Sequence, residues 1–419
     1  MQRGRMFPFR RGVMTAVCLC TLLSCSAPDD DRDLFAEAKR LHDRILTVDT
    51  HADTPLLLLR DDWNIAEFHA YKGERRDSRI DLPRMAEGGL DAEFFAVFVG
   101  QGRRNPESYL EAKEKALLLL AAVHEMVRNS PDLVDLATSP ADAYRIEKAG
   151  KRAAFIGMEN GYPVGKDISL LKEYYDRGVR YLTLCHSADN DICDSSTERV
   201  HTEDEGLSEF GEKVVAECNR LGMMVDVSHS SERSFFDVLE HSGAPVIASH
   251  SNVRSLCDHP RNLSDAQLKA LAEKGGVIQL SLVSGFVKEP PPDPERERAL
   301  TAFHKKHGDW RKIKDKKLRD EAREELTEIY EAFSGRKATL EEFVDHIDYV
   351  VRLIGVDHVG IGSDFDGGGG IQGCRHVGEM PNITQELLRR GYVEDDIRKI
   401  WGGNLMRVFE KVIQTAEKS

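Results

Sequence analysis

Residues 153–160 read Ala-Ala-Phe-Ile-Gly-Met-Glu-Asn, a short apolar run that ends in one carboxylate, Glu159. Such a run is typical of a strand buried on both faces, as in a parallel sheet. Seven similar runs occur beyond residue 40, at 45–49, 92–99, 181–185, 223–227, 245–248, 276–282 and 358–361. Longer stretches separate them, and those at 208–220, 264–274 and 384–390 have helical signals and end close to a glycine. Eight strands joined by crossover helices predict an α/β fold, a TIM-like (β/α)8 barrel.

The polar residues that follow these runs indicate where the chemistry lies. Six of the eight runs end in an imidazole or carboxylate, namely His51 with Asp53, Glu159, His186, His229, His250 and Asp364. Each residue alone could be a hydrogen-bonded side chain or a helix cap. Closing a barrel brings all of them to its carboxyl end, where barrel enzymes place their active sites. Histidine nitrogens and carboxylate oxygens together suit zinc, and one carboxylate can bridge two ions.

One connection is much longer than the others. Residues 288–337 open with three prolines and continue as a strongly charged stretch with helical character over 295–332. We interpret it as a helical insertion in the seventh βα connection, because long loops in compact domains are usually lids or interaction segments. A simple spacer is the alternative.

The N-terminus predicts export. Arginines up to Arg11 precede an apolar run at 13–23 that is too short to span a bilayer and right for a signal peptide. The run ends in Leu22-Leu23-Ser24-Cys25, which resembles a bacterial lipobox with Cys25 as the acylated residue. We expect a signal peptide at 1–24, a tether and helix start at 25–40, and one catalytic barrel at 41–419. The protein would then be lipid-anchored in a bacterial envelope, on the periplasmic or surface side. An ordinary secretory signal with an incidental cysteine is the alternative.

Charge and cysteine content argue against a nucleic-acid-binding protein and against a disulfide-rich or cysteine-knuckle protein. The formal net charge is −14, and removal of the four arginines in residues 1–24 makes the remainder about −18, so nucleic acid is an unsuitable partner. Five cysteines remain after the signal and Cys25, and their spacing is neither a metal knuckle nor a dense disulfide framework. Buried thiols are favoured for Cys185, Cys193, Cys218, Cys257 and Cys374, with one bridge left open. No residue decides for or against a homodimer.

Taken together, the motifs resemble the membrane (renal) dipeptidases, zinc peptidase family M19, which are barrels of the metal-dependent hydrolase type. The motifs are HxD at 51–53, GMENG, LTLCH, DVSHSS, ASHSN, HPRN and GSDFDG, in order between His51 and Phe409. Segments 288–337 and 187–194 depart from the family pattern, which leaves side-chain and stereochemical preference open.

The resemblance implies a role for each residue. His51 and Asp53 would bind one zinc ion, His229 and His250 the other, and Glu159 would bridge the two. His186 would contact the scissile carbonyl and Arg261 the terminal carboxylate of a dipeptide. A hydroxide shared by two Zn²⁺ would attack the carbonyl while Asp364 carries the proton. Asp366 is a rival for the proton-carrying role, and either aspartate could instead form the turn.

Two other functions remain open at this stage. The first is a binuclear amidohydrolase acting on a cyclic amide, lactone or phosphotriester, although many of those use a carboxylated lysine where Glu159 stands. The second is an inactive lipoprotein that keeps the barrel for binding. The presence of all the expected ligands argues against it. We see no GxSxG elbow and no cysteine with a charge partner in sequence, which disfavours covalent catalysis.

Overall fold

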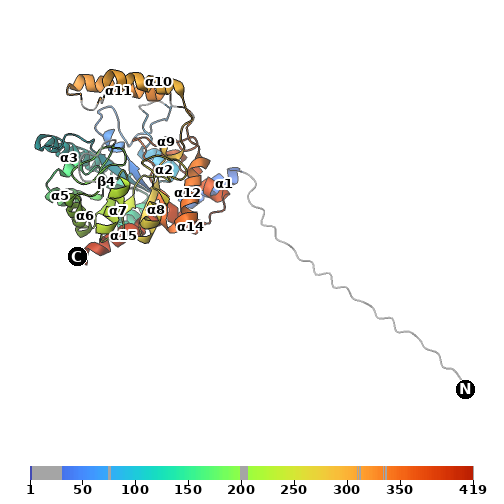
Figure 1. Ribbon diagram of the computed structural model, residues 1–419. Helices are drawn as coiled ribbons and strands as arrows, with labels where there is room; N and C mark the ends of the chain where they lie inside the picture. Colours follow the sequence, from blue (N-terminus) through green and yellow to red (C-terminus); the bar gives the residue numbers. More distant parts are fainter. Residues whose placement is uncertain are drawn as a thin grey trace.

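The fold is an eight-stranded parallel barrel surrounded by helices (Figure 1). The computed structural model describes residues 1, 31–73, 77–198, 206–308, 310, 313–333, 335 and 337–418. The sheet runs in the order β1-β2-β4-β5-β6-β7-β8-β9, and every pairing is parallel. The strands are β1 (Val48–Ala52), β2 (Ala92–Phe98), β3 (Val134–Leu136), β4 (Arg152–Glu159), β5 (Val179–Thr183), β6 (Met224–Asp226), β7 (Ile247–Ala248), β8 (Val277–Leu280) and β9 (Val359–Ile361). The predicted fold class is confirmed.

The boundaries of the strands differ from the apolar runs in ways that have physical causes. β1 starts three residues later than its run and includes His51, and β7 contains only two residues. β3 was not predicted. It pairs with the start of β4 outside the barrel path and carries Asp135 in its centre, so it has no apolar signature.

The barrel is closed between β9 and β1 by the segments just beyond the two strands. Ala52 forms a parallel bridge with Phe365. The amide of Asp53 donates to the Phe365 carbonyl at 2.9 Å, and the amide of Asp364 donates to the His51 carbonyl at 2.9 Å. We call these contacts between the first and last strands the seam. The seam therefore includes residues that were predicted to be functional.

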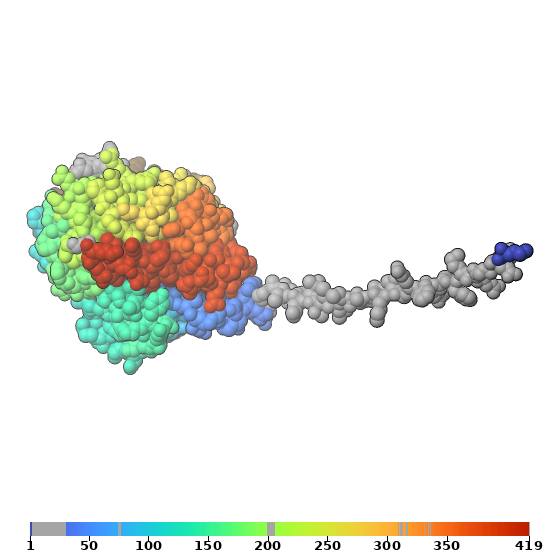
Figure 2. Space-filling view, turned by 90° about the horizontal axis from the view of Figure 1, so that it is seen from below, coloured from blue at the N-terminus to red at the C-terminus, as the bar shows by residue number. Residues whose placement is uncertain are grey.

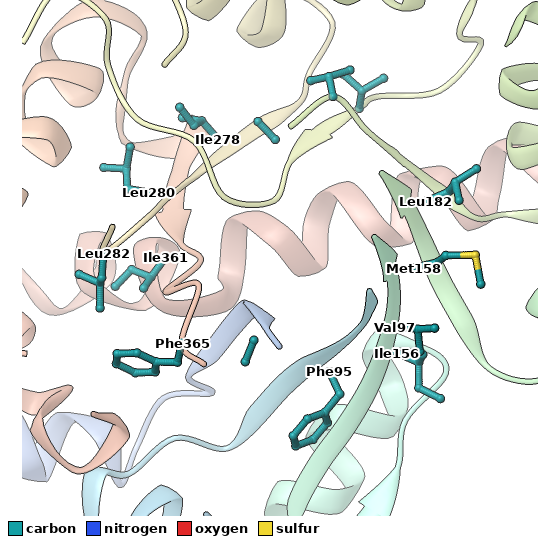
Figure 3. Packing of buried hydrophobic residues seen from close by; sticks show 14 of the residues in the cluster. Phe95, Val97, Ile156, Met158, Leu182, Ile278, Leu280, Leu282, Ile361 and Phe365 are labelled. Atoms are coloured by element: carbon teal, nitrogen blue, oxygen red, sulfur yellow. The ribbon is translucent and has the colours of Figure 1, made fainter. Parts of the chain in front are cut away.

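The two faces of the barrel wall belong to different cores. On β2 and β4, Ala92, Phe94, Ala153 and Phe155 belong to one cluster, whereas Phe95 and Val97 alternate with them and belong to the other. Because Glu159 lies an even number of residues from Phe155, the Phe155 side is the interior. Figure 3 shows side chains of the outer cluster, which fill the layer between strands and helices.

Fifteen helices are described, and the predicted ones are present. They are α1 (Asp31–His42), α2 (Leu82–Gly88), α3 (Pro106–Asn129), α4 (Pro140–Lys148), α5 (Ser169–Asp176), α6 (Glu209–Leu221), α7 (Glu232–His241), α8 (Asp265–Glu273), α9 (Ser284–Val287), α10 (Pro294–His307), α11 (Lys316–Ala332), α12 (Leu340–Ile354), α13 (Pro381–Arg389), α14 (Glu394–Arg398) and α15 (Asn404–Ala416). α8 begins with a capping box between Ser264 and Gln267, and α6 ends at Gly222 in the left-handed region. α15 contributes Phe409 to the interior cluster and crosses the underside of the molecule (Figure 2).

The long charged segment is a pair of helices, α10 and α11, in the seventh connection of the barrel, as predicted. Figure 1 shows the pair above the rest of the molecule. Phe303 of α10 and Ala322 of α11 are buried. Within the part of the chain that the structure describes, every helix is too short or too polar to cross a membrane.

Helix α1 is attached to the barrel through His42, which is buried at its last position. Trp401 Nε1 donates to Thr384 Oγ1 at 2.6 Å, and Thr384 Oγ1 lies 2.7 Å from His42 Nε2. His42 Nδ1 lies 3.1 Å from the Gly88 carbonyl, which can only accept, so the neutral Nδ1–H tautomer satisfies the chain of contacts. Burial lowers the pKa of His42 to about 4.

Candidate metal centre

The strand ends bring all the predicted ligands to one place. His51 lies in β1 with Asp53 just beyond it, Glu159 is the last residue of β4, and His229 and His250 follow β6 and β7. All five side chains are buried. His186 and Asp364, which follow β5 and β9, line the pocket that opens above them. The six strand ends therefore converge, as the sequence predicts.

Glu159 lies at the centre of the cluster, and its two oxygens face different partners. Oε2 lies 3.6 Å from His51 Nε2. Oε1 lies 3.2 Å from His229 Nε2 and 3.5 Å from His250 Nε2. Two ligands of a tetrahedral zinc ion are roughly 3.3 Å apart, given Zn–N bonds of about 2.0–2.1 Å. The separations match those of ligands that share an ion.

Several buried polar atoms at this place have no hydrogen-bond partner. They include His51 Nε2 and Asp53 Oδ1. His51 Nε2 and Asp53 Oδ2 are 3.9 Å apart, too far for a hydrogen bond. A buried unpaired polar atom is costly, and a cation between these atoms would satisfy them. The donor set of imidazole and carboxylate therefore fits a metal ion of the zinc type.

Three groups of residues among those described could hold an ion, and they overlap. The groups are His51, Glu159 and His250; Glu159, His186 and His229; and His51, Asp53 and Asp364, with ligand atoms within 4.8 Å of one another in each. Glu159 belongs to two of the groups, and its carboxylate has two oxygens with which it could contact two ions. The division differs from the one that the resemblance implies, because His250 is grouped with His51 and His186 with His229.

Hydrogen bonds behind the imidazoles orient them toward the centre. His51 Nδ1 lies 2.8 Å from the Tyr181 hydroxyl. His250 Nδ1 lies 2.8 Å from the Ser249 hydroxyl, which donates to Asp226 at 2.6 Å. Partners of this kind fix the tautomer of a metal-binding histidine and raise its basicity. Sequence reasoning missed them, although Asp226 inside an apolar run was a signal that could have found this support.

The backbone is strained at the same place. Among the described residues, non-glycine residues with positive φ are Asn160 (76°), His229 (70°), Asp364 (60°) and Asp366 (63°). Asp53 also leaves the extended conformation, with φ −81° and ψ 14° at the start of a short helix, Thr54–Leu56. The chain therefore turns at Asp53 instead of continuing β1. Strained residues that gather at one site indicate function.

Charge and burial shift the pKa values of the cluster. Burial alone would lower the pKa of His51, but the negative charges of Glu159, Asp53 and Asp364 together raise it to about 10. Burial raises the pKa of Asp364 to about 7, against the opposing attraction of His51. Burial lowers the pKa of both His229 and His250, which favours the neutral imidazole that binds metal.

The pocket above the cluster is lined by apolar residues and by an arginine as well as by the acidic residues and histidines. Its apolar walls come from Leu56, Phe98, Val283 and Phe286, none of which was predicted. Arg261, which was predicted, also lines the pocket and is 3% exposed. Its Nη2 donates to the His250 carbonyl at 2.9 Å, Nη1 lies 3.4 Å from Ser251 Oγ, and Nε has no partner.

The rival aspartates differ in their surroundings. Asp366 accepts hydrogen bonds from Thr54 Oγ1 at 2.7 Å and from the Arg79 amide at 2.6 Å. Asp364 belongs instead to the potential metal-binding group with His51 and Asp53.

The five cysteines named above are buried and free, which agrees with the favoured interpretation as buried thiols.

Known proteins resemble this chain along most of its length. The model of the membrane dipeptidase family, peptidase family M19, matches residues 35–419. Dipeptidase aclJ of Aspergillus oryzae is 33% identical over 362 residues, covering 83% of this chain and 74% of the relative. The crystal structure of the probable dipeptidase PvdM from Pseudomonas aeruginosa has a TM-score of 0.80 at 33% identity, over 92% of this chain and 99% of the other.

A further solved structure shows a ligand of the expected class. It is a metallo peptidase from Rhodobacter sphaeroides liganded with a phosphinate mimic of the dipeptide L-Ala-D-Ala, with a TM-score of 0.70 at 26% identity, over 88% of this chain and 99% of the other. The family and the fold indicate a metallo-dipeptidase, and the cluster of histidines and carboxylates at the mouth of the barrel is the candidate metal centre. The chain belongs to the membrane dipeptidase family, peptidase family M19.

Proposed function

We propose that this protein is a binuclear zinc dipeptidase that cleaves dipeptides with a free C-terminal carboxylate. The main support is the orientation of Glu159. One of its oxygens faces His51, and the other faces His229 and His250. His51 and Asp53 would hold one ion, and His229 and His250 the other. Glu159 would bridge them, where many related barrels use a carboxylated lysine.

The metal would activate water, and the side chains would bind the substrate and transfer protons. Bound zinc would lower the pKa of a water molecule so that hydroxide forms near neutral pH. His186 has a side chain 24% exposed, next to Glu159, and its Nδ1 lies 2.8 Å from the Ser187 hydroxyl. If that hydroxyl donates, Nε2 carries the proton and can donate to the carbonyl oxygen of the scissile bond.

Asp364 would accept the proton of the nucleophile and deliver it to the leaving amine. It lines the pocket beside His51 and Asp53, whereas Asp366 is already held by Thr54 and Arg79. Both oxygens of Asp366 are therefore committed to protein donors, which supports Asp364 as the proton carrier.

Arg261 would bind the terminal carboxylate. Its guanidinium is planar and presents paired donors that match a carboxylate. Its guanidinium carbon lies over the ring of Phe286, at 5.4 Å from the centroid, and both residues line the pocket. In a dipeptide the terminal carboxylate lies one residue beyond the scissile bond, so a cation that lines the same pocket as the metal-binding residues would favour dipeptides.

One experiment tests the function as a whole. Metal analysis of the purified protein should find about two zinc ions per chain, because five protein ligands exceed the needs of one catalytic ion. Hydrolysis should then be measured for a panel of dipeptides of both stereochemistries, their amides, and lactones. Activity on lactones without dipeptides would favour another amidohydrolase, and metal-free protein without activity would favour a binding lipoprotein.

We also propose that the protein is exported and lipid-anchored in a bacterial envelope, with residues 1–24 as signal peptide and 41–419 as one catalytic barrel. Cys25, the proposed acylation site, and residues 2–24 of the proposed signal peptide lie outside the described residues. Support comes from the apolar run and lipobox-like Leu22-Leu23-Ser24-Cys25 alone.

A further inference from the structure

Glu93 is a fully buried acid that the proposed mechanism does not use. It is 0% exposed, and neither of its carboxyl oxygens has a hydrogen-bond partner. Glu93 is the second residue of β2 and shares the outer face of that strand with Phe95 and Val97, in the apolar layer beneath the helices. An ionised carboxylate without a partner in such a layer is very costly.

The neighbour of Glu93 is a second buried acid, Asp49, which lies directly opposite it in the register of β1 and β2. The two carboxyl groups are within hydrogen-bonding reach. Asp49 Oδ2 has no partner, whereas Oδ1 accepts from the Ser363 amide at 2.7 Å and from the His51 amide at 3.3 Å. Asp49 thus holds together the two segments that carry His51 and Asp364.

Elementary electrostatics decides how the pair is satisfied. Two adjacent carboxylates in an apolar layer cannot both be ionised, and one shared proton satisfies Glu93 and Asp49 Oδ2 at once. The amides of Ser363 and His51 both donate to Asp49 and favour its ionised form, whereas only the Phe94 amide acts on Glu93 in this way. We therefore assign the proton to Glu93. Burial, followed by the charge of Asp49, raises the pKa of Glu93 well above its usual range, which agrees with this assignment.

We propose that Glu93 is a positioning residue whose carboxylic acid donates to Asp49 and thereby fixes the segments of His51 and Asp364 in the metal centre. The pair lies outside the metal-binding groups found among the described residues. It would act on the centre only through the Asp49 carboxylate, as an outer support of the kind whose loss typically weakens metal binding. This inference rests on the metal centre of the proposed function but not on its substrate.

Three variants separate a proton donor from a space-filling side chain. Glu93→Gln keeps the shape and an N–H donor for Asp49, whereas Glu93→Leu keeps the volume without a donor. Asp91→Asn is the matched control, a buried acid of the same region that is held by Arg152 at 2.9 Å and by Thr47, away from the metal centre. Zinc affinity is measured by competition with a chromogenic chelator, with circular dichroism as the check on folding.

We expect Glu93→Leu to bind zinc about 10- to 100-fold more weakly, the usual effect of losing an outer support, and Glu93→Gln and Asp91→Asn to stay close to the native protein. Equal losses in Glu93→Gln and Glu93→Leu would overturn the proposal, as would native affinity in Glu93→Leu. If Glu93→Leu fails to fold, the Gln variant and infrared spectroscopy still decide.

The infrared difference between native protein and Glu93→Gln should contain the carbonyl band of a protonated carboxylic acid at neutral pH. A carboxylate band instead would show an ionised Glu93 and refute the inference. The measurement needs no substrate and can be made without metal. If the native protein bound no zinc, the proposed function would be wrong. The infrared measurement would still show whether Glu93 is protonated.

Discussion

Arg261 offers the sharpest test of substrate recognition. Its guanidinium is 3% exposed and lines the pocket, and its Nε has no protein partner, so donors remain for a ligand. A hydrogen bond to a charged group contributes about 1.5–3 kcal/mol. If two such bonds hold the substrate carboxylate, Arg261→Ala should lose at least about 3 kcal/mol, and at about 1.4 kcal/mol per tenfold that is roughly two orders of magnitude in kcat/KM.

The assay compares a dipeptide with its C-terminal amide for each variant. The native protein should cleave the free acid far better, whereas Arg261→Ala should cleave the acid about 100-fold more slowly and the amide almost unchanged. Lysine at the same position should restore only part of the loss, since an ammonium lacks paired donors. Tripeptides should be poor substrates, because their carboxylate is displaced from the cation.

Controls separate recognition from support of the metal ligand. Arg261 Nη2 also holds the His250 carbonyl, so zinc content must be measured for every variant. Arg254→Ala is the matched control, because Arg254 lies in the same loop, bonds to Glu232 and the Asn262 carbonyl, and does not line the pocket. Equal losses on acid and amide, with metal retained, would refute the recognition of the carboxylate.

Four further predictions concern the bridge, the proton carrier, the fold and the anchor. Glu159→Gln should lower zinc occupancy at both positions, and elemental analysis that finds only one ion lost would make Glu159 a terminal ligand. Asp364→Asn should fold and keep its metal but lose turnover by roughly 100- to 10,000-fold, with Asp366→Asn the milder; a rate for Asp364→Asn within a few-fold of native would contradict the role. His42 is neutral when folded, so its contribution is complete above pH 6.5 and is lost as the pH falls toward its folded pKa of about 4; urea unfolding should therefore show a loss on the order of 3 kcal/mol that His42→Gln lacks. Cys25→Ser should release the protein from the membrane fraction or stall its processing with activity intact, and unchanged fractionation would argue against acylation.

The eight strands could be predicted because each is buried on both faces and so appears as an apolar run. Glu159 and the histidines stand at the ends of these apolar runs in the sequence, and closing the barrel brings the ends of the runs together. β3 was not predicted because Val-Asp-Leu is too short for its alternation to indicate a strand. The helical insertion was predictable from its length and charge.

The finer geometry of the site could not be read from the sequence. The left-handed φ of His229 and Asp364 depends on tertiary hydrogen bonds that hold a strained backbone, and no local signal marks it. Phe98 ends β2 and Phe286 lies in the short helix α9, and no local pattern shows that both side chains would line one pocket. The chain turns at Asp53, yet the carboxylate of Asp53 lies 3.9 Å from His51 Nε2.

The seam between the first and last strands has a consequence for the order of folding. Asp49 and Ser363 are separated by 314 positions in the chain, so closing this contact costs more loop entropy than joining neighbouring strands. Contacts of such long range form late and open early, and peptide groups of His51, Asp53 and Asp364 make them. Amide exchange at Asp53 and Asp364 should therefore report barrel opening directly. Ions that bind only the closed form would slow this exchange by mass action, so metal supply would control the lifetime of the folded chain as well as its chemistry.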